Sequence, residues 1–431
     1  MNVVLKPHST HIIITLTNNT PPHRMTRSAK EINSNMQKKL KTQTLAIDTP
    51  FDRKDPYGAI GIPVYNTVAY EFDTAKDMAD AFTGRVLVPD YSRVMNPTVT
   101  YFENKVKAIT GAANVFAFNS GMAAISNIFF AICAAGKNVV TSRHLFGNSF
   151  ALLDTTLRRF GVDARMADLT SADTVEEAID DNTCCIYLET VTNPQMEVAD
   201  LKALSEIAHR HNIPLIADTT MIPFTKFSAK ALGVDIEVVS STKYLSGGAT
   251  SLGGLIIDYG TFPKVNDIIR KELLLNIGAY MTPQAAYMQA LGLETLEARY
   301  SAQARNAFWL AQRLDGVKAV KVNSLALDHN PYHEIARRQF NGTYGAMLTI
   351  DLDSEQACYD FINRLQLIRR ATNLFDNKTL AIHPYSTIFG NFTPEQKASM
   401  DVLPTTIRLS VGLEDIDDIC DDIYQALQPR H

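Results

Sequence analysis

A single lysine follows an apolar run and precedes a glycine-rich run in the stretch Val238–Gly254, VVSSTKYLSGGATSLGG. The residues directly before Lys243 are Ser240, Ser241 and Thr242, whose hydroxyl groups suit a phosphate ligand. At the end of a buried strand, desolvation would lower the pKa of the Lys243 amine and make it a nucleophile or base. Lys243 could also bind a phosphate or be a solvated surface charge. The order of a P-loop, GxxxxGKS or GxxxxGKT, is absent.

Two other short segments have polar residues in comparable positions. Ser120-Gly121-Met122 follows an apolar run and opens a predicted helix, where free N–H groups and the helix dipole favour an anion. A capped helix start explains this segment equally well. Asp218 ends the apolar run LIAD, where a carboxylate could pair with a ligand cation, cap a turn or hold a metal. Because no second acidic residue is near it in the sequence, we predict no metal site.

The three segments together fit one ligand. A helix N-terminus binds a phosphate, a carboxylate binds a protonated ring nitrogen, and a lysine binds an aldehyde. Pyridoxal 5'-phosphate contains all three groups, and a Schiff-base lysine with an acidic partner for the pyridine nitrogen is its usual protein environment. Gly121, Asp218 and Lys243 therefore predict a pyridoxal-phosphate site.

Short apolar runs alternate with longer helical patterns and must position these segments. We expect strands at 114–120, 138–142, 184–190, 214–220, 236–242 and 253–258, and helices at 121–136 and 200–212. Strands that are apolar throughout and alternate with helices predict a mostly parallel sheet covered on both faces. Ligands of such sheets bind at the carboxyl ends of the strands, which is where the polar residues occur.

The chain is expected to have two main domains and an N-terminal extension. Residues 1–40 are polar, basic and interrupted by prolines, and their apolar core HIIITL is shorter than that of a signal peptide, so we expect a disordered or extended segment. Residues 41–95 lead into a cofactor-binding domain at 96–294. A long helical stretch at 293–314, a strand at 345–352, a helix at 355–365 and a strand at 406–412 predict a smaller α/β domain over 295–431.

Composition excludes several classes of protein. The 431 residues are 46% apolar, which allows a large core, and the net charge of −5 gives no basic surface for nucleic acid. The apolar runs are too short to span a bilayer. Five scattered cysteines without a CxxC pair are typical of reduced thiols in a cytoplasmic protein.

Six motifs resemble, in order, those of the Cys/Met-metabolism family of pyridoxal-phosphate enzymes. They are YSRVMNPT (91–98), NSGMAAI (119–125), ETVTNP (189–194), ADTT (217–220), SSTKYL (240–245) and IRLSVGLED (407–415). The resemblance covers nearly all of residues 42–425. It implies the α/β fold type I, like aspartate aminotransferase, with a large, mostly parallel, seven-stranded sheet domain and a smaller C-terminal α/β domain.

The resemblance also implies roles for individual residues. Lys243 would form the Schiff base, Asp218 would bind the pyridinium nitrogen, and Asn193 would lie near the ring hydroxyl. Arg408 would bind the substrate carboxylate as a bidentate fork. The phosphate would contact Gly121, Met122, Ser240 and Thr242, together with Tyr91 and Arg93 from the arm (41–95) of a neighbouring subunit. A shared site requires a homodimer, and the family is usually tetrameric.

One departure from the family concerns the cofactor ring. Phe146 stands where the family commonly has a tyrosine; it can stack on the ring but cannot transfer a proton. A proton role of that tyrosine would pass to Tyr91 or Lys243, or would be unnecessary with a good leaving group such as acetate.

Several segments favour the O-acetylhomoserine sulfhydrylase branch. LSGGATSLGGLIID and FDNKTLAIHPYST (375–387) resemble its motifs, although Gly248 replaces a histidine and Phe375 a glycine. Asn148 replaces the cysteine that is usual in methionine γ-lyases. Thr379 would lie near the substrate carboxylate, and a turn hydroxyl explains it equally well.

The resemblance thus implies γ-replacement on O-acetyl-L-homoserine by sulfide, giving L-homocysteine and acetate. Cystathionine γ-synthase, with cysteine as nucleophile, and a γ-lyase, with water, would use the same residues. A catalytically silent cofactor-binding protein is a further alternative. The sequence does not decide between acetyl, succinyl and phosphoryl activation of homoserine.

Overall fold

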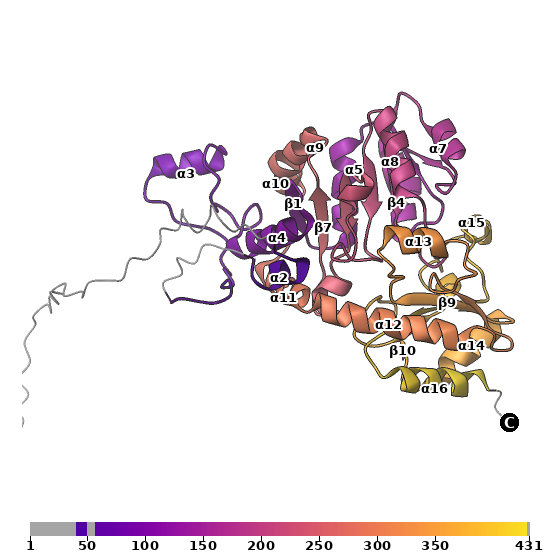
Figure 1. The fold of residues 1–431 in the computed structure, drawn as a ribbon. Coiled ribbons are helices and arrows are strands. Elements are labelled where there is room, and N and C mark those ends of the chain that lie inside the picture. Colours follow the sequence, from indigo (N-terminus) through magenta and orange to yellow (C-terminus); the bar gives the residue numbers. More distant parts are fainter. Residues whose placement is uncertain (1–39, 50–56, 429–431) are drawn as a thin grey trace, which may run out of the picture. The chain divides into compact units, whose positions relative to one another are not determined.

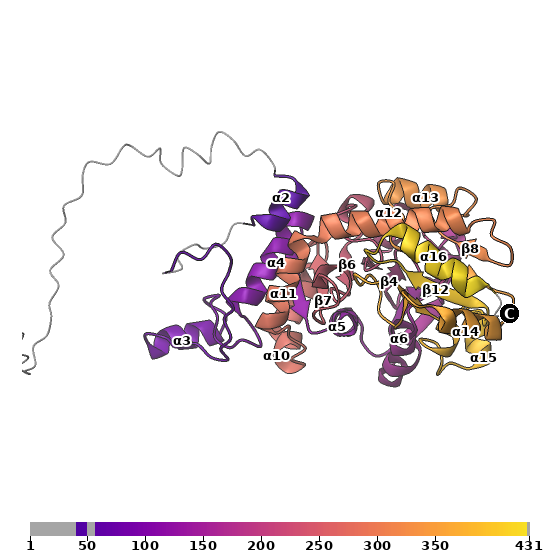
Figure 2. The ribbon, with the colours of Figure 1, turned by 90° about the horizontal axis from the view of Figure 1, so that it is seen from below.

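The computed structural model describes residues 40–49 and 57–428 (Figures 1 and 2). All but Leu40 of the segment predicted to be extended, 1–40, lies outside the described residues. The residues from Thr42 onward group into one compact unit. None of the helices in the described stretches is long and apolar enough to cross a lipid bilayer.

The larger sheet has seven strands in the order β1-β7-β6-β5-β4-β2-β3. Its strands are β1 (Asn114–Phe118), β2 (Asn138–Thr141), β3 (Asp163–Met166), β4 (Thr183–Glu189), β5 (Leu215–Asp218), β6 (Ile236–Val239) and β7 (Gly254–Asp258). Only β7 runs antiparallel to its neighbours β1 and β6 among these strands. The predicted mostly parallel sheet is therefore confirmed, and β3 is a strand that the sequence patterns did not predict.

Helices cover both faces of this sheet because its strands are apolar on both sides. In β4, Ile186 and Leu188 belong to one core, and Tyr187 belongs to the other. The first core includes side chains of α4 (Pro97–Thr110) and α8 (Leu201–Arg210), and the second includes those of α5 (Gly121–Ile132). This alternation follows from the two-residue period of a strand and secures the sheet from both sides.

The helix starts follow ordinary capping chemistry. Ser120 caps α5, where its side-chain oxygen accepts a hydrogen bond from the N–H of Ala123. Asn96 caps α4 in the same way, and Pro97 occupies the first helical position. A side-chain cap satisfies one of the N–H groups that the first turn leaves without an intrahelical acceptor.

The smaller sheet has five strands in the order β10-β11-β12-β9-β8. These are β8 (Lys321–Asn323), β9 (Met347–Asp351), β10 (Arg369–Arg370), β11 (Leu380–Ile382) and β12 (Thr406–Ser410). The helices α12 (Leu296–Leu314), α14 (Glu355–Arg364) and α16 (Ile416–Leu427) lie along this sheet in Figure 1. The fold class, a large mostly parallel sheet with a smaller sheet, is as predicted.

The helical stretch predicted at 293–314 is interrupted at Thr295. α11 (Pro283–Glu294) ends before this residue, and α12 begins after it. The domain limits predicted at 41, 96 and 295 stay predictions. The remaining helices are α2 (Thr42–Ile47), α3 (Ala75–Phe82), α6 (Gly147–Ala151), α7 (Ala172–Ala178), α9 (Pro263–Ile268), α10 (Leu274–Asn276), α13 (His333–Gln339) and α15 (Pro394–Ser399).

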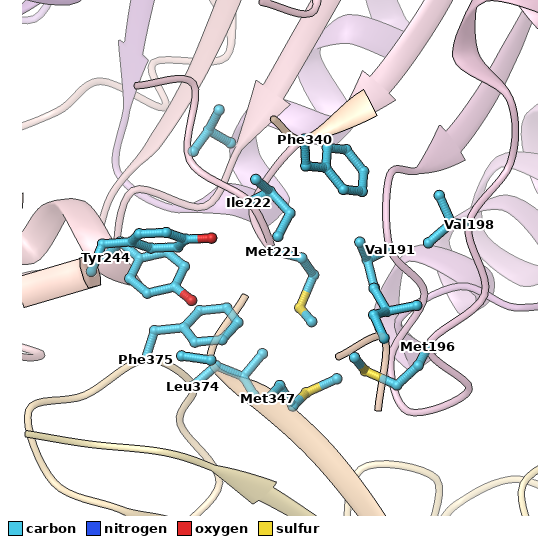
Figure 3. Close-up of a cluster of buried hydrophobic side chains, with 14 of the residues drawn as sticks. Val191, Met196, Val198, Met221, Ile222, Tyr244, Phe340, Met347, Leu374 and Phe375 are labelled. Carbon is cyan, nitrogen blue, oxygen red and sulfur yellow. The ribbon is translucent and has the colours of Figure 1, made fainter. Parts of the chain in front are cut away.

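A buried cluster beside Lys243 joins the two sheets. Figure 3 shows Met221 and Tyr244 next to Met347, Leu374 and Phe375. All five are buried members of one hydrophobic core. Met221 and Tyr244 follow β5 and β6 of the larger sheet, whereas Met347 begins β9 of the smaller one, so this core supports the region between the sheets.

Candidate active site

A cavity of about 890 Å³ lies at the carboxyl ends of the parallel strands. It is bordered by segments that follow β1, β4, β5 and β6, and by Arg408 in β12 of the smaller sheet. Ten of the residues that the sequence predicted for the site line this cavity: Gly121, Met122, Phe146, Asn193, Asp218, Ser240, Thr242, Lys243 and Arg408, with Ser120 of the motif SGM. The topology of a parallel sheet thus collects segments that are far apart in the sequence.

Lys243 lies four residues beyond the end of β6 and is half-buried. Its Nζ donates a hydrogen bond to Oδ1 of Asn373 at 2.9 Å. Burial, and then the positive charge of Arg408, lower the pKa of the Lys243 amine to about 8, although the carboxylate of Asp218 opposes this shift. About a tenth of the amine is therefore unprotonated at pH 7, and most of it above pH 8, in the form that a nucleophile or base requires.

Asp218 has a carboxyl neighbour that the sequence analysis did not find. Glu189 ends β4 and is the register partner of Asp218 on the parallel strand β5. Burial raises the pKa of Asp218 to about 6, and burial, together with the negative charge of Asp218, raises that of Glu189 well above its usual value. No acidic residue is near Asp218 in the sequence, but parallel pairing brings residues 29 positions apart into register and places Glu189 beside it.

Glu189 and Asp218 are a pair of carboxyl groups at neighbouring strand ends. Within the described stretches, no group of three or more His, Cys, Asp or Glu side chains could hold a metal ion. Asp218 Oδ1 accepts a hydrogen bond from the N–H of Thr220 at 2.9 Å, which holds the carboxylate in place. Such a carboxylate is suited to a cationic group of a ligand.

The N-terminus of α5 and the end of β6 approach each other closely. A Cβ atom added to Gly121 would lie 2.7 Å from Cβ of Ser240, so only glycine fits there. The Ser240 N–H donates to Oγ1 of Thr220 at 2.8 Å, and the Thr242 hydroxyl accepts from the N–H of Gly253 at 2.9 Å. The first-turn N–H groups of this 12-residue helix therefore face a hydroxyl-rich strand end, an arrangement that suits a phosphate.

Arg408 is a buried cation without an acidic partner among the described residues. The side chain is 2% exposed, and burial lowers its pKa to about 9. Its Nη2 donates to the carbonyl oxygens of Thr372 at 3.0 Å and Asn373 at 3.3 Å, and Nη1 donates to Oδ1 of Asn193 at 3.3 Å. The Nε atom is buried and has no hydrogen-bond partner. An unpaired buried guanidinium that faces a cavity is suited to a ligand carboxylate.

Phe146 is anchored through its backbone. Its N–H donates to Oε1 of Glu189 at 2.5 Å, directly before α6 begins. The ring lines the cavity, where it offers an apolar face and no exchangeable proton.

Three predicted site residues do not line the cavity of their own chain. Tyr91 is 41% exposed and pairs with Ala69. The Nη1 of Arg93 donates to the carbonyl oxygen of Leu275 at 2.5 Å. The hydroxyl of the fully buried Thr379 donates to Glu414 Oε2 at 2.8 Å, and such a bond is typical of a structural turn.

Some cavity residues escaped the sequence analysis. Glu189 had a usable signal, because it ends a predicted strand just as Asp218 does. Asn373 had none, because it follows the two-residue strand β10, which was not predicted. Thr372, Leu374, Thr387 and Ile388 also line the cavity from this part of the chain.

The arrangement has one complementary group for each part of a pyridoxal phosphate bound to an amino acid. A helix N-terminus suits the phosphate, a buried carboxylate the ring nitrogen, an amine of lowered pKa the aldehyde, and an unpaired guanidinium the substrate carboxylate. Fold and site together define an α/β pyridoxal-phosphate enzyme of fold type I.

Comparison with known proteins gives the family. The model of the Cys/Met metabolism PLP-dependent enzymes matches residues 43–428, and the chain belongs to this family. L-methionine gamma-lyase of Fusobacterium nucleatum subsp. nucleatum is 37% identical over 380 residues, covering 87% of this chain and 95% of that protein.

Two solved structures have similar folds. The putative O-acetylhomoserine (thiol)-lyase of Campylobacter jejuni contains N'-pyridoxyl-lysine-5'-monophosphate; it has a TM-score of 0.86 and 30% identity, covering 90% of this chain and all of that one. O-acetylhomoserine sulfhydrylase of Wolinella succinogenes has a TM-score of 0.70 and 42% identity, covering 78% and 99%. The protein is thus a pyridoxal-phosphate-dependent enzyme of sulfur amino-acid metabolism.

Proposed function

We propose that this enzyme catalyses γ-replacement on O-acetyl-L-homoserine by sulfide, giving L-homocysteine and acetate in the cytoplasm. The observation that carries an amino-acid reaction is the presence of Lys243, Asp218 and the unpaired Arg408 in one cavity. The motifs around Gly248 and Thr379 and the 42% identity to a sulfhydrylase support the choice of reaction.

The residues that would hold the cofactor follow from the geometry. The N-terminus of α5 at Gly121 and Met122, with the hydroxyl groups of Ser240 and Thr242, would bind the phosphate. Asp218 would bind the ring nitrogen, with Phe146 against the ring face and Asn193 near the ring hydroxyl. We further propose that Tyr91 and Arg93 act at the phosphate site of a second subunit.

The side chains of this protein would bind the substrate and transfer its protons. When bound, pyridoxal phosphate would hold the substrate amine through its aldehyde carbon and accept the electron pair that a departing proton leaves. Arg408 would bind the α-carboxylate through Nε and so orient the α-carbon towards Lys243. The neutral Lys243 amine would then remove the α proton, and Asp218 would stabilise the positive charge of the ring nitrogen.

Exchange at the γ-carbon needs little help from a protein acid. Loss of a second proton, from the β-carbon, allows the carbon–oxygen bond at the γ-carbon to break, and acetate leaves with its electrons. Hydrosulfide then forms the new carbon–sulfur bond at the γ-carbon, and protons return to the α- and β-carbons. Acetate is a weak base and leaves without being protonated, whereas a thiolate leaving group benefits from a nearby acid. A phenylalanine at position 146 is compatible with the first reaction and less suited to the second.

γ-Elimination is the second candidate, because a methionine gamma-lyase is 37% identical over most of the chain. No nucleophile would then add to the γ-carbon, and L-methionine and water would give an oxo acid, ammonia and methanethiol. Cysteine in the place of sulfide would give cystathionine.

A product assay tests these choices. The purified enzyme with pyridoxal phosphate is supplied with O-acetyl-, O-succinyl- or O-phospho-L-homoserine, or with L-methionine, in the presence of sulfide, cysteine or neither. We expect homocysteine from O-acetylhomoserine and sulfide as the fastest reaction. Faster formation of methanethiol from methionine would reject γ-replacement in favour of the lyase, and turnover of none of the substrates would indicate a catalytically silent protein.

A further inference from the structure

Phe375 has a backbone conformation that is unusual for its residue type. Its φ is 56°, in the left-handed region that bulky residues rarely adopt and that glycine adopts freely. The side chain is nevertheless fully buried. A strained conformation of this kind persists only where the surroundings of the residue stabilise it.

The stabilising contact is an aromatic stack on the neighbour of Lys243. The Phe375 and Tyr244 rings are parallel within 9°, with centroids 4.0 Å apart, and Figure 3 shows the two rings side by side. Tyr244 in turn meets Tyr300 edge to face, at a centroid distance of 5.1 Å. Since Tyr244 follows Lys243 directly, the stack ties the backbone of the lysine to that of Phe375.

Two of the three residues before Phe375, Thr372 and Asn373, contact the charged groups of the site. Asn373 Oδ1 accepts the hydrogen bond from Lys243, and the carbonyl oxygens of Thr372 and Asn373 accept those from Arg408 Nη2. The Phe375 N–H donates to Oγ of Ser410 at 2.7 Å, two residues beyond Arg408 in β12. The segment thus holds both Lys243 and Arg408 through hydrogen bonds, while Arg408 Nε has no partner.

A second contact joins the same two parts of the chain. Asn377 Nδ2 donates to the carbonyl oxygen of Gly247 at 3.2 Å. Gly248 has a φ of 124°, and a Cβ atom there would lie 2.3 Å from Asn377 Nδ2. Thus the two departures from the sulfhydrylase motifs, Gly248 and Phe375, both lie where the residues after β6 meet the segment 372–377.

We propose that Phe375 is a positioning residue, whose stack on Tyr244 holds the segment Thr372–Phe375 against Lys243 and Arg408. The segment then keeps two guanidinium nitrogens of Arg408 engaged and leaves Nε for the substrate carboxylate. The part that concerns the substrate rests on the proposed function. The part that concerns the segment does not.

The test compares variants that remove or keep the Tyr244–Phe375 stack with a control variant elsewhere in the core. Phe375→Leu keeps an apolar side chain and the left-handed backbone but removes the ring. Tyr244→Phe keeps both rings. Phe340→Leu is the matched control, because Phe340 is also fully buried, makes an aromatic contact with Phe227 and does not line the cavity. Phe375→Gly, which also relieves the backbone strain, replaces Phe375→Leu if that variant does not fold.

Two measurements are made on the cofactor-loaded, full-length protein. Amide hydrogen exchange of residues 372–377 should be about tenfold faster in Phe375→Leu, and should be unchanged in Tyr244→Phe and Phe340→Leu. The KM for the amino-acid substrate should rise about tenfold, with kcat within about threefold, because a misdirected Arg408 weakens substrate binding more than chemistry.

The outcomes separate the two parts of the proposal. Wild-type exchange of residues 372–377 in Phe375→Leu would overturn the positioning role. An equal KM in Phe375→Leu and Phe340→Leu, despite faster exchange in Phe375→Leu, would also overturn the positioning role. If the wild type turns over no homoserine ester, the proposed function fails, and the exchange comparison still decides whether Phe375 holds the segment.

Discussion

Lys243 lies between two charges of opposite sign, and its basicity reflects both. Burial and Arg408 disfavour its protonated form, whereas Asp218 favours it, and the result is a pKa of about 8. Arg408 itself has no carboxylate partner among the described residues that would screen it from the lysine. Arg408, which is proposed to bind the substrate, thus also lowers the pKa of Lys243, the proposed base.

Removal of the lysine amine tests its assignment directly. Lys243→Ala should reduce turnover by about 10³-fold or more, because among the described residues no other amine lines the cavity to act as base. The variant should also lose the visible absorbance that a lysine-bound pyridoxal phosphate gives. Circular dichroism of the variant should match the wild type, and retained turnover in a correctly folded variant would refute the role of Lys243.

The pKa of Lys243 predicts a dependence of kcat on pH. Most of the amine is protonated below about pH 8, and only the neutral fraction can accept a proton. At saturating substrate, kcat should therefore rise about tenfold per pH unit towards pH 8 and level off above it. Arg408→Gln removes a charge that lowers this pKa, so its profile should move to higher pH. A shift of the Arg408→Gln profile to lower pH, or no shift, would contradict the effect of Arg408 on the pKa of Lys243.

At the scale of elements, the sequence predicted those features that depend on local pattern. Strands such as 236–239 and the helix at Gly121 were recognisable from apolar periodicity and capping residues, and the polar residues that follow them do line the cavity. The antiparallel direction of β7 was not predictable, because an apolar run has the same composition in either direction. Pairing between distant strands was equally hidden, and this is why Glu189 was missed as the neighbour of Asp218.

The family resemblance identified some site residues that the sequence pattern alone did not. Without it, Arg408 is an ordinary residue of the apolar strand TIRLS, and only tertiary packing leaves its Nε without a partner. Asn373 and the Tyr244–Phe375 stack depend on a segment with only two strand residues, where no period can be read. Short irregular segments therefore limit prediction of the site more than the regular elements do.

The close approach of α5 to β6 gives a prediction at this scale. Gly121→Ala should weaken pyridoxal-phosphate binding by about tenfold or more, because the new Cβ would meet Ser240 at 2.7 Å and force the helix N-terminus away from the strand end. Titration of the cofactor-free protein with pyridoxal phosphate measures the dissociation constant.

Gly61→Ala is the matched control for this substitution. A Cβ at Gly61 has no atom within 4 Å, and the backbone there has no positive φ. The control should bind the cofactor as the wild type does. Equal affinity in Gly121→Ala and the wild type would show that the helix N-terminus is not part of the phosphate site.

At the scale of the whole molecule, the arm that precedes α4 exposes many apolar side chains. Tyr57, Ile60, Phe82 and Leu87 are 94%, 97%, 65% and 70% exposed, and Figure 2 shows α3 projecting from the sheets. Solvent exposure of so many large apolar groups is typical of a surface that another protein molecule covers. Tyr91 belongs to the same arm.

A shared active site predicts that two inactive variants restore each other. Lys243→Ala lacks the proposed base, and Arg93→Ala lacks the proposed phosphate ligand supplied to a second subunit. If both are unfolded together, mixed and refolded, about half of the dimers are mixed, and each mixed dimer has one site with both residues intact. About a quarter of all sites should then be active.

The same experiment decides between sharing and a purely local role of Arg93. If Arg93 acted only within its own chain, through its hydrogen bond to Leu275, each subunit of a mixed dimer would keep its own defect and no activity would return. Each variant refolded alone is the control for activity regained by refolding, and sedimentation of the mixture confirms that dimers have formed. Activity at a quarter of the sites would be far above the activity of either variant refolded alone. Such recovery requires that one subunit supplies Lys243 and the other supplies Arg93.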